Sequence, residues 1–304
     1  MSKSQVELEL IDALSCCKRS IIAEAGKAWA NCNFSLAEPK LVKSFAMESG
    51  KGVHYLNSSL ATNFNSSQNR FVLKFAAVYT HQRPYVERRP RNISLRKGSN
   101  RTERCELADL GFLSVFVDQN KKVITSRASF FQAKKDESID NETQQWLYDF
   151  DGGFEYKHSS FWELTDCATP SREFPAWSEG RSSAFQYLLL LSNTKIKVRL
   201  SPWSMDHTHS FGFFFYRLLT MGAGIPYQSN ESMSGGWSSI VSDVLRMGGG
   251  DMAGKHRGSI GLDKIVDYFN SFKSHDRYFY ESAGAEGFPI IIAIMQDAQF
   301  KDEG

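Results

Sequence analysis

The sequence has few cysteines, and none of them stand at a spacing typical of a metal site. Its five cysteines are scattered over 304 residues and form no C-x-x-C pair. An odd, scattered set argues against both a disulfide framework and a structural zinc site, and it is typical of reduced thiols. Long apolar runs are also missing. The longest, YLLLL at 187–191 and FPIIIAIM at 288–295, are far too short to cross a bilayer.

A secretory signal is not recognisable either, because Glu7, Glu9 and Asp12 interrupt the stretch that would have to be apolar. We therefore expect a cytoplasmic protein with no membrane partner. Hydrophobic residues make up 41% of the chain and aromatic residues 13%, which is enough for a large core. Since no repeat or long linker divides the sequence, we expect a single domain over 1–304.

Net charge is small, at +2, but basic residues are concentrated in one segment. Residues 83–104, RPYVERRPRNISLRKGSNRTER, contain eight lysines and arginines against two glutamates. Such a segment is what attraction to a phosphate backbone requires, although a run of charge is also typical of a solvated loop. Candidate nucleic-acid contacts here and just before it are His81, Gln82, Arg83, Arg88, Arg89, Arg91, Arg96 and Lys97. For His81, stabilisation of a helix end is an equally ordinary role.

Apolar periodicity and turn residues predict a mixture of helices and strands. Residues 3–30, 36–48 and 70–82 are expected to be helical, and the Asn- and Ser-rich segment 57–69 is expected to be a loop. An antiparallel hairpin follows, with strands at 105–117 and 123–134 joined by a turn at 118–122.

The later half is predicted to be richer in helices. Segment 182–192 fits either a helix or a strand, 195–201 alternates as a strand does, and 288–295 closes the chain as a strand. Helices are expected at 210–224, 237–250 and 259–273. The fold class is thus α/β (α+β), a mixed sheet flanked by helices, with a helix-rich C-terminal extension at about 205–280.

The predicted hairpin brings a carboxylate, an amide and an amine to one edge of a sheet. Asp109 begins its first strand, while Gln132 and Lys134 end its second strand and share one face because they are two residues apart. Glu106 lies three residues before Asp109. Mg²⁺ takes one or two carboxylates together with water and substrate phosphate, and a lysine beside it can orient water. Chance juxtaposition at a solvated strand end is the alternative.

The series E-L-A-D (106–109), hairpin, Q-A-K (132–134) resembles the signature of the restriction-endonuclease-like PD-(D/E)xK nucleases, in the Q-x-K form of Mrr-type enzymes. The resemblance covers about residues 70–135. It implies that Asp109, Gln132 and the Ala133 carbonyl bind Mg²⁺ or Mn²⁺ and that Lys134 positions water. The family's helix glutamate has no match in 70–82, so Glu106 is its substitute.

The resemblance implies a magnesium-dependent endonuclease that acts on DNA in a bacterial defence or restriction-like pathway, either as a homo-oligomer or with a partner protein of a defence system. The alternative is a catalytically inactive module of the same fold that binds nucleic acid or a protein. The uncharged Gln132 and the missing helix glutamate keep this second reading open.

Two other motifs are weaker. GGDMAGKH at 249–256 matches G-x-x-x-x-G-K, but His256 replaces the Ser or Thr of a P-loop and a helix is predicted where a strand should precede it. MDHTH at 205–209 brings His207 and His209 to one face beside Asp206, yet no third ligand stands at a diagnostic spacing. We expect neither segment to bind a nucleotide or a metal.

Overall fold

The structure is a computed structural model, and it describes most of the chain. The described residues are 4–67, 70–80, 83–89, 104–139, 142–149, 151–163, 167, 169–231, 234–249, 261–271, 278–280 and 287–298. Within these ranges no helix has the length and apolar character that crossing a membrane requires.

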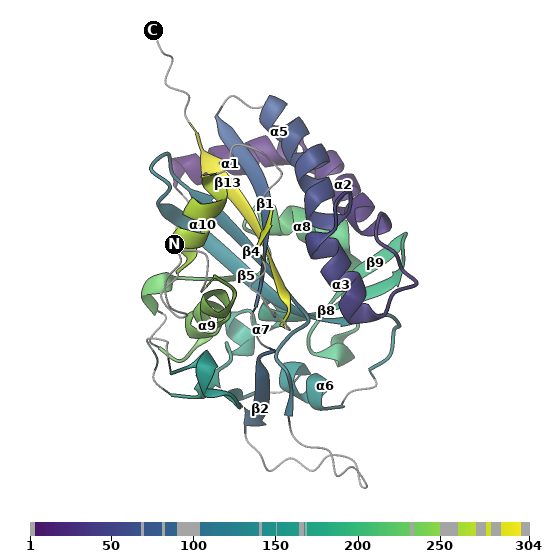
Figure 1. The fold of residues 1–304 in the computed structure, drawn as a ribbon, viewed down its shortest axis with the longest axis vertical. Helices are drawn as coiled ribbons and strands as arrows, with labels where there is room; N and C mark the ends of the chain where they lie inside the picture. Colours follow the sequence, from purple (N-terminus) through teal and green to yellow (C-terminus); the bar gives the residue numbers. More distant parts are fainter. Residues whose placement is uncertain are drawn as a thin grey trace.

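A large mixed sheet forms the centre of the molecule, with helices on both faces (Figure 1). Its strands lie in the order β10-β9-β8-β5-β4-β13-β1-β12, and β11 pairs with a free part of β5. The predicted fold class, a mixed sheet flanked by helices, is confirmed. The strands are β1 (Phe71–Tyr79), β4 (Leu110–Val117), β5 (Val123–Lys134), β8 (Phe185–Ser192), β9 (Lys195–Leu200), β10 (Thr208–Ser210), β11 (Ile225–Pro226), β12 (Phe279–Tyr280) and β13 (Pro289–Asp297).

The predicted hairpin is present as β4 and β5, which pair antiparallel from Leu110 opposite Phe131 to Val117 opposite Val123. The turn between them is fixed by Asp118, whose carboxylate accepts hydrogen bonds from the backbone N–H groups of Asn120 and Lys122. On the other edge of β5, β8 runs parallel to residues 130–134. The strand β13 lies between β4 and β1, so a segment near residue 290 pairs with two strands from the first half of the chain.

Segment 70–82, predicted as a helix, is instead the strand β1, and that prediction is wrong. Its apolar residues are compatible with either period, because a strand buried on both faces reads as a continuous apolar run. All nine residues except Val72 are buried, and β1 pairs with β13 over its whole length. Pairing with β13 along the whole strand decides the conformation here.

Segment 57–69, predicted as a loop, is helical where it is described, and that prediction is wrong as well. A π-helical segment η1 (Leu56–Ala61) continues into α5 (Thr62–Ser67). The Asn57 side chain accepts from the Phe75 N–H (2.8 Å) and donates to the Phe75 carbonyl (2.7 Å). Asn65 does the same for Leu73. These asparagines form hydrogen bonds with the backbone of β1 at residues that β12 does not reach. They therefore hold the helical segment against the sheet and do not form a turn.

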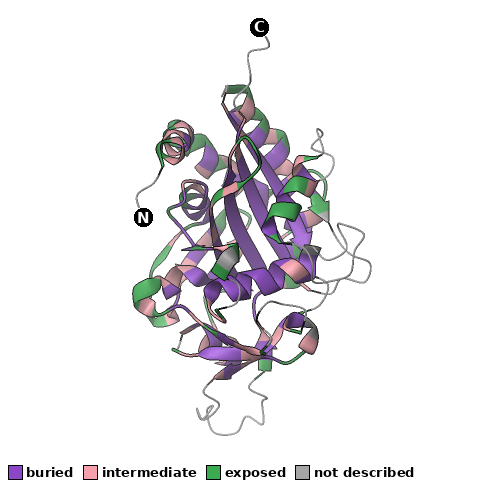
Figure 2. Cartoon of the chain, turned by 90° about the vertical axis from the view of Figure 1, so that its left-hand side faces the viewer, coloured by how far each residue is buried: buried purple, intermediate pink, exposed green. Residues whose placement is uncertain are grey.

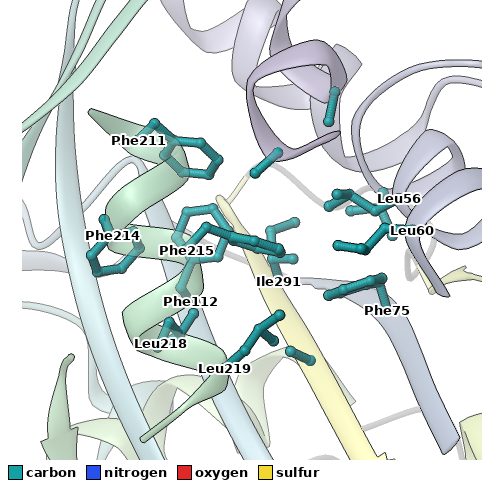
Figure 3. Close-up of a cluster of buried hydrophobic side chains, with 14 of the residues drawn as sticks. Leu56, Leu60, Phe75, Phe112, Phe211, Phe214, Phe215, Leu218, Leu219 and Ile291 are labelled. Atoms are coloured by element: carbon teal, nitrogen blue, oxygen red, sulfur yellow. The ribbon is translucent and has the colours of Figure 1, made fainter. Parts of the chain in front are cut away.

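One face of the sheet is covered by the N-terminal helices and α8. The helices are α1 (Gln5–Cys16), α2 (Lys18–Ala30), α3 (Glu38–Met47), α4 (Gly52–Tyr55) and α8 (Phe211–Leu219). Phe112 of β4 contacts the rings of Phe211, Phe214 and Phe215 in this layer. Figure 3 shows these rings facing Ile291 and Phe75 across the layer.

The other face carries α6 (Glu142–Asp149), α9 (Trp237–Gly249) and α10 (Leu262–Asn270), together with a small antiparallel sheet. That sheet has the order β3-β2-β6-β7, from β3 (Arg104–Glu106), β2 (Tyr85–Arg89), β6 (Gly153–Tyr156) and β7 (Ser171–Glu173). Short helical segments complete the chain at α7 (Arg181–Ala184), η2 (Ser159–Phe161), η3 (Trp177–Glu179), η4 (Trp203–Met205) and η5 (Ser229–Glu231).

The buried strands of the large sheet separate these two layers, as Figure 2 shows. The three helices predicted at 210–224, 237–250 and 259–273 are α8, α9 and α10. Because α8 packs on one face and the other two on the opposite face, the residues expected to form an extension belong to the two main layers.

The first predicted hairpin strand, 105–117, is divided between the two sheets. Residues Arg104–Glu106 pair with β2 in the small sheet, and β4 begins only at Leu110. The backbone bends over the three residues between them. This bend places Asp109 at the junction of the two sheets, one residue before the strand that it was expected to begin.

Candidate active site

Asp109 joins the two strands of the hairpin at the end remote from its turn. Its backbone N–H donates to the Phe131 carbonyl (2.8 Å), and its carboxylate Oδ2 accepts from the Ala133 N–H (2.9 Å). The side chain therefore bonds to the strand that carries Gln132 and Lys134, on either side of Ala133. The sequence prediction that these residues meet at one end of the hairpin agrees with this geometry.

Gln132 and Lys134 face the layer that holds α6 and the small sheet. Phe131 and Ala133 belong to the opposite core, and residues alternate between the two faces along a strand. Gln132 is 0% exposed and Lys134 is 9% exposed. Both side chains therefore lie inside the protein, near the place where the two sheets meet. They do not belong to a strand end that runs out into solvent.

Burial raises the pKa of the Asp109 carboxyl to about 7. The Ala133 N–H and the ammonium of Lys134 lower this pKa, while the nearby Glu106 carboxylate raises it. An acid in this setting resists ionisation until a cation is brought close to it. A divalent cation bound beside this carboxyl would lower its pKa.

The Gln132 side chain has one satisfied group and one unsatisfied group. Its Nε2 donates to the main-chain carbonyl of Glu106 (3.1 Å), which fixes the orientation of the amide. Its Oε1 is buried and has no hydrogen-bond partner among the described residues. A buried acceptor without a donor costs free energy, and a cation bound beside this oxygen would offset that cost.

Lys134 is held by a residue of the neighbouring helix. Its Nζ donates to Oε1 of Gln144, in the first turn of α6, at 3.0 Å. The position of α6 is itself fixed at its other end, because the buried Arg181 donates to the Leu147 carbonyl (2.8 Å). The ammonium therefore has a defined position near Asp109, as its effect on the Asp109 pKa also indicates.

Glu106 lies close to Asp109 but is engaged by another residue. Its carboxylate Oε1 accepts from Arg83 Nη1 at 2.6 Å, and its main chain receives the Gln132 amide. Glu106 is thus placed where the sequence analysis expected a second carboxylate. Its charge is shared with Arg83, so it contributes less to a metal site than an unpaired carboxylate would.

A cleft of about 1020 Å³ adjoins this end of the hairpin and is rich in cations, although neither Gln132 nor Lys134 lines it. Asp109, Glu106 and Gln144 contribute to its lining. The basic side chains around it come from α3, from the small sheet and from the segments that adjoin that sheet: Lys40, Lys43, Arg83, Arg104, Lys157 and His158. Five lysines and arginines against two carboxylates give the cleft the electrostatics of a phosphate site.

The donor set fits Mg²⁺ or Mn²⁺ better than a softer metal. Among the described residues, no group of three His, Cys, Asp or Glu side chains gathers in one place, which leaves no all-protein metal cage there. Mg²⁺ usually keeps several waters and is held by one or two carboxylates plus substrate phosphates. Asp109, the orphan Oε1 of Gln132 and a backbone carbonyl would match that kind of site.

The basic segment is only partly described, and its described residues differ in what they do. Arg83 lines the cleft, and Arg89 pairs with Glu155. Arg88 is 4% exposed and lies over the ring of Trp146, so its guanidinium is inside the protein and not on a phosphate-binding surface as expected. His81, Gln82, Arg91, Arg96 and Lys97 lie outside the described residues, and their role stays a prediction.

The two other motifs differ in how far the structure describes them. Residues 250–256 of the G-x-x-x-x-G-K match are outside the described ranges. The rings of His207 and His209 are 6.2 Å apart by centroids on the edge strand β10 and the residues before it. Burial lowers the pKa of His209 to about 4, with smaller contributions from His207 and Arg217.

His209 is expected to make the protein less stable in mild acid. Its pKa is about 4 in the folded protein against 6.5 as the ordinary value, so the unfolded chain binds a proton that the native one does not. The free energy of unfolding should therefore fall as pH falls from 6.5 towards 4, by on the order of 1–2 kcal/mol from this residue. Urea titrations of His209→Gln over this window should show a flatter pH dependence than the parent protein, and an unchanged pH dependence would contradict the prediction.

Several site residues were missed by sequence reasoning. Gln144 lies ten residues after Lys134 at the start of a helix, and only the return of α6 to the hairpin end reveals its contact. Lys40, Lys43 and Lys157 are distant from the basic segment in sequence. No spacing signal connects these residues, because the cleft is assembled from α3, the small sheet and the hairpin.

Comparison of this chain with models of known protein families, with curated proteins and with solved structures gave no match.

Proposed function

We propose that this protein is a nuclease that uses Mg²⁺ or Mn²⁺ to hydrolyse phosphodiester bonds in DNA. The observation that carries the proposal is the meeting of Asp109, Gln132 and Lys134 at one end of the β4–β5 hairpin, below a cleft lined by cations. A restriction-like or antiviral defence role follows from the resemblance of the motif and is part of the proposal.

Each residue has a distinct role in this proposal. Asp109 is the charged ligand, with the Gln132 Oε1 and the Ala133 carbonyl as neutral ligands. When bound, the ion supplies charge neutralisation at the phosphate and activation of water. Lys134, held by Gln144, orients the attacking water and stabilises charge that develops on the phosphate oxygens. The cations of the cleft attract the DNA backbone.

Incubation of the purified protein with plasmid DNA tests the proposal. Cleavage should require Mg²⁺ or Mn²⁺, should stop when EDTA is added and should resume when the metal is restored in excess. Absence of cleavage with either metal, in a protein shown by circular dichroism to be folded, would count against the enzyme.

A second candidate is a non-catalytic module that binds nucleic acid through the same cleft. The pairing of Glu106 with Arg83 favours it, because that pair removes a carboxylate from the donor set. In the same experiment this candidate predicts DNA binding that weakens steeply with salt, with no cleavage under any metal condition.

Replacing Gln132 by glutamate is expected to tighten Mn²⁺ binding about tenfold, because a carboxylate would replace the orphan amide oxygen beside Asp109. Without metal the variant should be less stable than the parent, since it buries a second carboxylate at the same place. Calorimetric titration with Mn²⁺ and thermal melts with and without the ion measure both effects.

Gln186 offers a matched control for that variant. It is also buried, at 1% exposed, on the adjacent strand β8, and its amide donates to Ser129 Oγ and the Ser183 carbonyl. Gln186→Glu should destabilise the protein without changing its Mn²⁺ affinity. Equal Mn²⁺ affinities for Gln132→Glu and the parent would mean that Gln132 does not face the ion.

A further inference from the structure

The reactive groups of the site lie deep, and this depth limits what can reach them. Gln132 is fully buried, Lys134 is 9% exposed and Asp109 is half-buried. Of the three, Asp109 lines the cleft, so a phosphate that is to meet it has to enter the cleft. The cleft volume of about 1020 Å³ is close to the upper end of ordinary small-molecule sites, ~300–1,000 Å³, which leaves room for a few nucleotides.

The phosphates of a DNA duplex lie on the outside of a stiff double helix. They are therefore less able than those of a flexible single strand to reach a half-buried carboxylate such as Asp109. One extended strand presents its phosphates singly and can pass into the cleft. The recessed position of Asp109 therefore favours unpaired DNA.

The cleft also combines aromatic rings with cations. Tyr85, half-buried on β2, has the Arg104 guanidinium over its ring at 4.1 Å from the centroid. Tyr79, at the end of β1, has the Lys43 ammonium at 5.1 Å but is only 8% exposed, so Tyr85 offers the more accessible ring. Both rings and both cations line the cleft. Rings for base stacking together with a basic track for the backbone are the features of proteins that bind single strands without reading sequence.

We propose that the substrate of this site is single-stranded DNA, or an unpaired end or gap in a duplex, and that Tyr85 is a stacking platform for a base next to the scissile phosphate. This inference rests on the proposed function for the chemistry, but it concerns which form of DNA enters the cleft. It makes Tyr85 and Arg104 determinants of substrate form.

Binding measured without metal tests the inference independently of cleavage. The probe is a fluorescein-labelled 15-nucleotide DNA strand of mixed sequence, compared by anisotropy with the same strand paired to its complement, in EDTA at 100 mM salt. The full-length protein should bind the single strand at least tenfold more tightly than the duplex. Equal affinities, or tighter duplex binding, would overturn the inference.

Variants of Tyr85 test whether this residue contributes to the preference for single-stranded DNA. Tyr85→Ala should weaken single-strand binding about 5- to 150-fold, the range for loss of one stacked base, and change duplex binding less than twofold. Tyr85→Phe should bind as the parent does because it keeps the ring. The control is Tyr216→Ala: Tyr216 is also half-buried beneath a cation, Lys18 at 5.2 Å, but it lies on α8 outside the cleft.

The outcomes separate the inference from the proposed function. Preferential binding of the single strand without any cleavage would support the inference and count against the nuclease. Cleavage of duplex plasmid by a protein that shows no preference for the single strand would support the nuclease and overturn the inference. A parent-like single-strand affinity in folded Tyr85→Ala would remove Tyr85 from the site.

Discussion

Replacing Lys134 by methionine is expected to lower the rate of metal-dependent DNA cleavage by on the order of a hundredfold. The ammonium, held at 3.0 Å from Gln144, is proposed to orient water and to stabilise charge that forms only in the transition state, a contribution of about 3 kcal/mol. Methionine keeps the length of the side chain and suits the buried position, which is 9% exposed. Initial rates under saturating metal measure the change.

Lys74 provides the control for this substitution. It is also 9% exposed, it lies on β1, and its Nζ donates to the Phe269 carbonyl near the end of α10. It lies in the middle of β1, opposite Ile294 of β13, and not at the end of the β4–β5 hairpin. Lys74→Met should change stability but leave cleavage at the parent rate. A folded Lys134→Met protein that cleaves as fast as Lys74→Met would eliminate the assigned role of Lys134.

Replacing Asp109 by asparagine is expected to abolish cleavage and Mn²⁺ binding while making the metal-free protein more stable at pH 8. Asparagine keeps the shape of the side chain and can still accept from the Ala133 N–H, but it removes the charged ligand. Burial raises the pKa of Asp109 to about 7 from an ordinary 3.8, so ionising this carboxyl costs free energy in the folded state.

The sign of the pH dependence follows from that shift. Between pH 4 and 7 the native protein holds a proton that the unfolded chain has lost, so the free energy of unfolding falls as pH rises through this window. Asp109→Asn should remove this decline and gain on the order of 2 kcal/mol at pH 8. Urea denaturation in EDTA at pH 5 and pH 8 measures it. If Asp109→Asn and the parent show the same change in stability between these pH values, the raised pKa of Asp109 is refuted.

The control is Asp243→Asn, which is expected to lose stability where Asp109→Asn gains it. Asp243 is buried too, and burial raises its pKa to about 6, but its carboxylate pairs with the buried Arg172 at 2.7 Å. Removing one partner of a buried pair leaves an uncompensated charge, so Asp243→Asn should lose about 3–5 kcal/mol of stability. At a temperature where it is still folded, this variant should cleave DNA normally.

Local signals in the sequence were sufficient for the hairpin and insufficient for β1. The β4–β5 hairpin combines apolar strands with a turn that Asp118 closes through its own neighbours, so the information lies within about thirty residues. The strand β1 is decided by β13, more than two hundred residues away. Likewise, Asn57 and Asn65 have turn-like chemistry by themselves, and only their pairing with β1 explains a helix there.

The candidate site was likewise predictable only where its residues belong to a single local segment. Asp109, Gln132 and Lys134 belong to one hairpin, and their convergence follows from its register. Gln144 and the cations of α3 come from other elements, and no pattern within one segment indicates their approach. For Arg88 the sequence prediction was wrong. Its charge suggested an exposed side chain that could bind phosphate, but its guanidinium lies over the ring of Trp146 and the side chain is buried.

The central claim is that the hairpin end holds a divalent cation, and crystals soaked in Mn²⁺ test it most directly. An anomalous difference map should show a peak in contact with the Asp109 carboxylate, close to the Gln132 Oε1, and no such peak in Asp109→Asn crystals. Well-ordered Asp109 and Lys134 side chains at saturating Mn²⁺ with no peak between them and the cleft would contradict the account.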